Sequence, residues 1–266
     1  MSLTPEFLDH ALDVALTAAD AATQVIRRYY GDGVEIDIEI KPDQTPVTIA
    51  DRAAEAAIKQ VLREAFPDHA YYGEEEGREG DSEFLWLIDP IDGTKSFVRG
   101  YPFFSTQIAL MYRDEIVLGV SSASEYGELA WARSGGGAWL NRLPLQVSDA
   151  ADFTPQTAIS FGNVKTLSRD ARWQTLAQLV QRSGRTRGYG DFLHYHLLAR
   201  GCIDLVIESD VNILDIAPLV IILREAGAVF TDLDGAEPGL ATTSVLAGPA
   251  ALHARALAEF RAAVPG

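Results

Sequence analysis

The residues best suited to chemistry lie at 85–97, where an apolar run meets two aspartates. The run Leu85–Ile88 predicts a buried strand, and it is followed by Asp89-Pro90-Ile91-Asp92-Gly93-Thr94. Proline has no N–H to donate to a neighbouring strand, so the strand should stop near Asp89, and a short helix is predicted over 94–98. Two carboxylates and a free peptide carbonyl would then lie beside a helix N-terminus. Hard divalent cations prefer such oxygen ligands and helix N-termini favour phosphate, which indicates metal-assisted phosphoryl chemistry.

The same residues have a plainer explanation, because Asp, Pro and Gly are also the commonest turn residues. Acids elsewhere in the chain bear on the choice. Asp51 falls in the first turn of a helix predicted over 49–66, and Glu74 lies in a run of three glutamates after a predicted strand. Asp215 lies at or just before the start of a helix that has Pro218 in its first turn. Taken singly, these acids are explained by helix capping or solvent exposure.

The elements that would position these residues fall into two halves, 1–150 and 151–266. In the first half, the pattern predicts helices over 5–29 and 49–66, a strand over 36–40, a polar loop over 41–46, and antiparallel strands over 103–111, 116–122 and 128–133. The glycine run at 134–137 lacks the GK[ST] ending of a phosphate loop, so it is interpreted as a turn.

A polar stretch at 148–155 marks the predicted boundary, and strands and helices alternate after it. The predicted order is strand 157–161, helix 168–183, strand 185–188, helix 190–200, strand 203–208, helix 214–226, strand 228–231, strand 244–248 and helix 249–263. This alternation is typical of an α/β fold. The chain is therefore predicted to join an α+β half to an α/β half.

Composition excludes several classes of protein. The 266 residues are 47% hydrophobic and 23% charged, with a net charge of −16. Nucleic-acid and anionic-membrane binding both need a basic face, so neither is expected, whereas bound metal ions would still allow an anionic substrate. No stretch approaches the ~18 apolar residues of a membrane span, and no signal peptide is expected. The single Cys202 cannot form an intramolecular disulfide, which fits a reducing cytoplasm.

Four separated segments, in this order and at this spacing, resemble the inositol monophosphatase superfamily of Mg²⁺-dependent, lithium-sensitive phosphatases. They are Thr45–Asp51 with Glu55, Gly73–Glu75, Asp89–Thr94 and Asp215–Pro218. The resemblance covers nearly the whole chain. It implies a layered αβαβα sandwich of the inositol monophosphatase and fructose-bisphosphatase type, a homodimer, and a phosphomonoesterase that acts on a small phosphate ester.

The resemblance also implies a ligand set. Glu74, Asp89 and the Ile91 carbonyl would hold a first Mg²⁺, and Asp89, Asp92 and Asp215 a second. A third, weaker ion would rely on Glu74 and water, and Mn²⁺ could replace Mg²⁺. Two ions about 3.5–4 Å apart can stabilise both the attacking and the leaving oxygen of an in-line displacement. Acids that converge without a metal would repel one another, which favours a metal site over separate structural explanations.

The remaining motif residues would bind water and phosphate. By resemblance, Asp51 and Thr94 would position the attacking water, and Gly93 and Thr94 would bind the phosphate through backbone N–H groups. The family usually has Trp before its last metal aspartate, whereas this chain has Leu214. That difference should alter the pocket wall modestly, by packing against Asp215.

Two stretches, 94–110 and 185–192, resemble a branch of the superfamily that hydrolyses L-histidinol phosphate. This substrate carries an ammonium and an imidazole, so its pocket should offer carboxylates. Asp191 and Glu208 are the candidates, and Arg187 is a further candidate for substrate binding. The structural alternatives are that Asp191 caps the following helix and that Glu208 is a strand-end acid.

Three other functions fit parts of the pattern. The first is an inositol-1-phosphate phosphatase with the same machinery, and the second is a nucleotide 3′-phosphatase or sugar bisphosphatase of the same superfamily. The third is a metal-binding regulatory protein without turnover. The Asp51–Thr94 pair argues against this third function, because regulation needs no water-activating pair.

Overall fold

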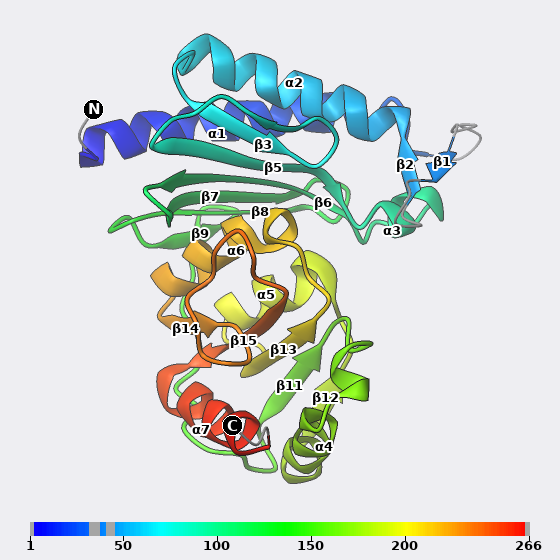
Figure 1. The fold of residues 1–266 in the computed structure, drawn as a ribbon, viewed down its shortest axis with the longest axis vertical. Helices are drawn as coiled ribbons and strands as arrows, with labels where there is room; N and C mark the ends of the chain where they lie inside the picture. Colours follow the sequence, from blue (N-terminus) through cyan, green and yellow to red (C-terminus); the bar gives the residue numbers. More distant parts are fainter. Residues whose placement is uncertain (1–2, 32–37, 41–45, 264–266) are drawn as a thin grey trace.

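The computed structural model describes residues 3–31, 38–40 and 46–263, and its elements stack in five layers (Figure 1). The layers are, in order, helices α1 (Pro5–Ile26) and α2 (Ile49–Ala65), an eight-stranded sheet, helices α5 (Asp191–Ala199) and α6 (Ile213–Glu225), a five-stranded sheet, and helices α4 (Arg172–Arg182) and α7 (Ala250–Ala262). The predicted αβαβα sandwich is confirmed.

Helices α1 and α2 begin at the predicted residues, 5 and 49, and each has a side-chain cap. The Thr4 hydroxyl accepts a hydrogen bond from the Phe7 N–H at 3.2 Å. Thr48 caps α2 in a capping box, in which the Asp51 carboxylate accepts the Thr48 N–H at 2.8 Å. Helix α1 ends at Ile26 rather than near residue 29, because residues 27–29 continue only as a turn.

The eight-stranded sheet brings the main motifs to one edge. Its strands are β3 (Ala70–Gly73), β4 (Gly77–Glu79), β5 (Phe84–Asp92), β6 (Ser105–Tyr112), β7 (Glu115–Ala123), β8 (Glu128–Arg133), β9 (Ala138–Leu140) and β10 (Leu143–Pro144), in the order β10-β9-β8-β7-β6-β5-β3-β4. Because β3 and β5 are parallel, their carboxyl ends lie together. The predicted antiparallel strands are β6, β7 and β8, and residues 134–137 form the predicted turn.

Two short elements flank this edge. Strands β1 (Ile38–Ile40) and β2 (Pro46–Thr48) form a separate antiparallel pair, and α3 (Thr94–Val98) follows β5 as predicted. Positions 36–37 of the predicted strand and 41–45 of the predicted loop lie outside the described residues.

Helix α6 lies between the two sheets and carries Asp215 in its first turn. Every residue of this helix is buried except Asp215, Arg224 and Glu225, as expected for a helix that is apolar all round. The helix approaches β7 closely at Gly119, where an added Cβ would lie 2.5 Å from the Pro218 Cα. Only glycine at this position allows the helix to pack so near the sheet.

The second half has the predicted order of elements. Its sheet contains β11 (Ala158–Phe161), β12 (Arg185–Arg187), β13 (Leu205–Ser209), β14 (Ala228–Thr231) and β15 (Ser244–Pro249), in the order β12-β11-β13-β15-β14. The helix predicted over 168–183 is instead divided into a 3₁₀ turn, η1 (Leu167–Arg169), and α4. Asp170 causes the break, because its backbone is extended and its carboxylate accepts the Arg172 N–H at 2.9 Å.

No regular element occupies the predicted boundary at 148–155, which lies between β10 and β11. None of the helices in the described part of the chain combines the length and apolar character that crossing a bilayer requires.

Candidate active site

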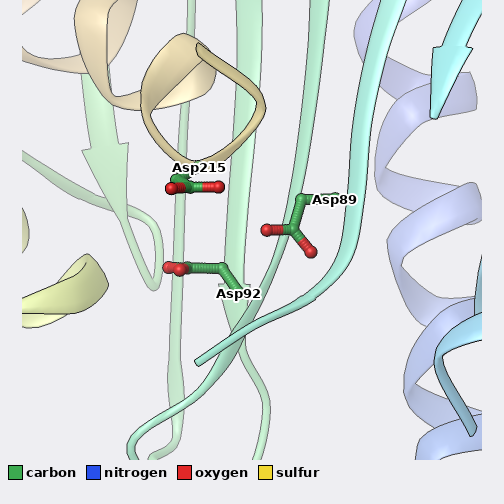
Figure 2. Close-up of side chains that lie close together, drawn as sticks. All are labelled: Asp89, Asp92 and Asp215. Carbon is green, nitrogen blue, oxygen red and sulfur yellow. The ribbon is translucent and has the colours of Figure 1, made fainter. Parts of the chain in front are cut away.

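Three of the predicted metal ligands converge where β5 meets α6. Asp89, Asp92 and Asp215 each contribute a carboxylate oxygen to a group in which all the oxygens lie within 4.8 Å of one another. Figure 2 shows the three side chains pointing toward one another. Two come from β5 and the third comes from the first turn of α6, so the group joins the two predicted halves of the chain.

A bulge in β5 brings Asp89 and Asp92 to the same face. In a regular strand, residues three apart point to opposite faces. Here Asp89 pairs with Gln107 and Asp92 pairs with Ser105, so β5 has one residue more than β6 between these pairs. The prediction that β5 stops near Asp89 is therefore wrong, because the bulge accommodates Pro90 and the strand continues to Asp92.

The carboxylates destabilise one another's charged forms. Burial, together with the negative charges of Glu74 and Asp92, raises the pKa of Asp89 well above its usual range. Burial and the neighbouring acids likewise raise the pKa of Asp92. Burial raises the pKa of Asp215 to about 7, although the Asn212 N–H opposes the shift. The three carboxyl groups therefore have too little positive charge near them to be fully ionised at neutral pH.

Glu74 belongs to the same cluster. Its N–H donates to the Ile88 carbonyl at 3.1 Å, which fixes it beside the residue that precedes Asp89. Its charge contributes to the raised pKa of Asp89, Asp92 and Asp215. An all-oxygen donor set with excess negative charge fits a hard divalent cation, whose charge would remove the repulsion.

The two residues that are predicted to position the attacking water, Asp51 and Thr94, are in contact. The Thr94 hydroxyl lies 3.3 Å from Asp51 Oδ1 and 3.0 Å from the Ile91 carbonyl oxygen. The other Asp51 oxygen, Oδ2, accepts the Thr48 N–H at 2.8 Å and the Thr48 hydroxyl at 2.6 Å. Burial raises the pKa of Asp51, while the hydrogen bonds from Thr48 oppose the rise. Asp51 is therefore held rigidly, with Oδ1 turned toward Thr94.

Gly93 makes the tight turn between β5 and α3. Its φ of 89° lies in the left-handed region, and an added Cβ would lie 2.6 Å from the Phe103 carbonyl oxygen. The first N–H groups of a helix have no partner within it. The turn therefore places the start of α3 directly after the strand that carries Asp89 and Asp92, which is the position that phosphate binding by this helix would require.

Asp191 and Glu208 lie near the predicted metal ligands. Their negative charges contribute to the raised pKa of Asp92, and burial followed by the charge of Glu208 raises the pKa of Asp191 to about 6. Gly190 occupies the cap position of α5, whereas Asp191 is its first residue and has a φ of 44°. The structure thus gives no support to the alternative that Asp191 is present as the helix cap.

Glu208, at the end of β13, accepts two hydrogen bonds and also lies against His194. Oε1 accepts the Asn163 N–H at 2.9 Å, and Oε2 lies 2.7 Å from the Tyr195 hydroxyl and 3.1 Å from His194 Nε2. Burial opposes ionisation, but the contact with His194 and the hydrogen bonds from Asn163 and Tyr195 together outweigh it and lower the pKa of Glu208. An added Cβ at Gly162 would lie 1.9 Å from Oε1, so a glycine is required beside this carboxylate.

Arg187 does not contact the acidic cluster of Asp89, Asp92 and Asp215. Its side chain is exposed at the end of β12, and its Nη1 donates to the Thr186 carbonyl at 2.7 Å. Among the described residues, no contact joins it to the acids.

The comparisons with known proteins agree with this geometry. The model of the inositol monophosphatase family matches residues 8–264. The chain belongs to this family. It is 37% identical over 260 residues to a histidinol-phosphatase of Streptomyces coelicolor, covering 94% of this chain and 96% of that protein. It is 39% identical over 232 residues to a histidinol-phosphatase of Mycobacterium tuberculosis, covering 84% of this chain and 88% of that protein.

A solved structure shows the same fold. The inositol monophosphatase of Anabaena superimposes with a TM-score of 0.81 at 28% identity, covering 97% of each chain. This member of the inositol monophosphatase family is a phosphoric monoester hydrolase. The family is metal-dependent, and the acidic cluster could hold a metal ion.

Sequence reasoning missed several residues that support the site in this inositol monophosphatase family member. Glu55 was noted as part of a motif, but its contact with the turn after β3 was not foreseen. The contacts of His194 and Tyr195 with Glu208 were not predicted from the sequence. The position of these two residues shortly after Asp191 in α5 is the signal that could have identified them. Leu214, where the family usually has Trp, packs in the core between the sheets.

Proposed function

We propose that this enzyme hydrolyses L-histidinol phosphate to L-histidinol and phosphate, with Mg²⁺ as its cofactor. The observation that carries the proposal is the position of Asp191 and Glu208, which add two carboxylates beside the metal ligands. A substrate with an ammonium and an imidazole would benefit from these charges, whereas a neutral polyol would not. The two histidinol-phosphatase relatives support the same substrate.

In the proposed site, Glu74, Asp89 and the Ile91 carbonyl hold one Mg²⁺, and Asp89, Asp92 and Asp215 hold another. A third ion would rely on Glu74 and water, and Mn²⁺ would be an acceptable substitute. When bound, the ions supply an activated water and stabilise charge on the attacking and leaving oxygens.

The chain's own residues orient the reactants. The Thr94 hydroxyl can donate to Asp51 or to the Ile91 carbonyl, and its free lone pair can accept a hydrogen bond from the nucleophilic water. Asp51 Oδ1 would receive the proton that the water loses. The backbone N–H groups of Gly93 and Thr94 would bind phosphate oxygens. Arg187 stays a predicted substrate-binding residue, although its guanidinium contacts the Thr186 carbonyl of its own strand.

The test compares phosphate release from histidinol phosphate, inositol 1-phosphate and adenosine 3′,5′-bisphosphate, using the purified protein with Mg²⁺. We expect histidinol phosphate to have the highest kcat/KM. Asp191→Asn should raise KM for histidinol phosphate by about 10–100-fold, because a hydrogen bond to a charged group contributes about 1.5–3 kcal/mol. KM for p-nitrophenyl phosphate should change little.

A matched control is Asp114→Asn, which removes the same charge in the exposed turn at the far end of β6 and β7. This variant should behave as the wild type with both substrates. Equal losses on both substrates in Asp191→Asn would contradict the assigned specificity. A preference for inositol 1-phosphate would favour the alternative named by the Anabaena structure, with the metal machinery retained.

We also propose that the enzyme is a lithium-sensitive homodimer that works in the cytoplasm. These properties follow from the family resemblance and from the single cysteine, Cys202. Size-exclusion chromatography with light scattering and a lithium titration of the activity would test the first two.

A further inference from the structure

A fully buried carboxylate lies beneath the turn that carries Glu74. We propose that Glu55 is a positioning residue, which fixes Glu74 and thereby sets the affinity of the site for divalent cations. The inference rests on the proposed role of Glu74 as a metal ligand.

Both oxygens of Glu55 bind the turn that follows β3. Oε2 accepts the Glu75 N–H at 2.8 Å, and Oε1 accepts the Glu76 N–H at 3.1 Å. The side chain of Glu55 is completely shielded from solvent. Because these donors occupy both oxygens, Glu55 acts on the metal site through Glu74 rather than as a ligand itself.

The end of β3 is shaped to admit this carboxylate. An added Cβ on Gly73 would lie 2.1 Å from Glu55 Oε1, so any larger residue would displace the carboxylate. On the opposite side, the Glu74 N–H donates to the Ile88 carbonyl at 3.1 Å. The backbone of Glu74 is therefore held from two directions, by β5 on one side and by Glu55 on the other.

The charge of Glu55 is neutralised locally. Lys59, one turn later on α2, lies 2.8 Å from Glu55 Oε1 and is itself buried. It also contacts Glu76 at 2.8 Å and Glu79 at 3.1 Å. The ammonium thus allows a charged acceptor to remain in a buried position, where hydrogen bonds to a charged group are strongest.

Loss of the Glu55 carboxylate should lower the affinity of the site for divalent cations. Groups that orient a ligand affect metal binding by typically 10–100-fold when they are removed. Glu55→Gln keeps the size of the side chain but replaces one acceptor oxygen by an NH₂ donor that faces the turn. One N–H of the turn loses its acceptor, and Glu74 should move out of line with Asp89.

The experiment measures Mg²⁺ and Mn²⁺ binding to metal-free protein by isothermal titration calorimetry, with circular dichroism to verify folding. We expect Glu55→Gln to bind each cation about ten-fold more weakly than the wild type. The matched control is Glu79→Gln, which removes another carboxylate from the same Lys59 without touching the turn. It should bind both cations within about two-fold of the wild-type affinity.

If Glu55→Gln does not fold, Glu55→Asp replaces it, because the shorter side chain keeps the charge but cannot reach both N–H groups. Weakened binding in whichever variant folds supports the inference. Wild-type affinity in a folded Glu55 variant overturns it, and so does an equal loss in Glu79→Gln. If the wild type binds no divalent cation, the proposed metal site fails rather than the role of Glu55.

Discussion

Replacing Asp215 by Asn should stabilise the metal-free protein while abolishing catalysis. Burial raises the pKa of this carboxyl from 3.8 to about 7, so its charged form is disfavoured in the folded state. A shift of about three pKa units corresponds to about 4 kcal/mol. Asn avoids the buried charge and keeps an oxygen that can accept the Asn212 N–H. Because Asp89 and Asp92 readjust their protonation, we expect a gain of about 2–4 kcal/mol at pH 8.

The assay is urea denaturation in the presence of a chelator, at several pH values between 5 and 8. A carboxyl with a raised pKa binds more protons in the folded state than in the unfolded state between about pH 4 and 7. Wild-type stability without metal should therefore fall as pH rises through this window. Asp215→Asn should show a shallower fall.

Adding Mg²⁺ should offset most of the stability difference between the two proteins. A cation that binds only the folded state at a hundred times its Kd contributes about 2.7 kcal/mol. The wild type should gain this stability and the variant should gain much less. The reasoning would be refuted if the metal-free variant were less stable than the wild type at pH 8. A wild-type stability that did not change between pH 5 and 8 would refute it equally.

Three further predictions concern the same framework. Metal affinity should rise between pH 5 and 8, because cation binding displaces protons from carboxyls such as that of Asp215, and calorimetry in buffers of different ionisation enthalpy would measure the protons released. Lys59→Met should lower the free energy of unfolding by about 3–5 kcal/mol, because it leaves a buried carboxylate unpaired. The control Arg63→Met, which removes a partly exposed ion pair with Glu79 and a cation–π contact with Tyr71, should cost about 1 kcal/mol in the same urea titration. Gly119→Ala should destabilise by about 1–3 kcal/mol in thermal unfolding, because the methyl group would meet Pro218 on α6, and unchanged stability would contradict the close approach described above.

The sequence predicted the order of the elements and the motif positions because these depend on local signals, whereas the five layers were implied by the family resemblance. Helices α1 and α2 begin at residues 5 and 49 as predicted, and the apolar run before Asp89 is a central strand. The bulge in β5 was missed because it depends on the register with β6, which no local pattern records. The break at Asp170 was missed because an acid there is compatible with a continuous helix until its side chain is seen to bind the Arg172 N–H.

The supporting contacts of the site were harder to predict. Glu208 receives its hydrogen bonds from Asn163 and Tyr195, which lie on other elements. Such pairings follow from tertiary packing and leave no periodic signal in the chain. The substrate-binding role of Arg187 stays a prediction, and the contact of its guanidinium with the Thr186 carbonyl could not be predicted from the sequence either.

The position of helix α6 between the two sheets affects the order in which the chain folds. It follows the predicted boundary in the sequence, yet it packs against the first sheet and brings Asp215 to Asp89 and Asp92. These contacts join segments that are far apart in the chain. The chain must therefore lose the entropy of closing a long loop before the contacts can stabilise it. A cation would find its full set of ligands only after the two halves have docked. We therefore expect Mg²⁺ to slow unfolding rather than accelerate folding. The ion would stabilise the folded protein without stabilising the transition state for folding.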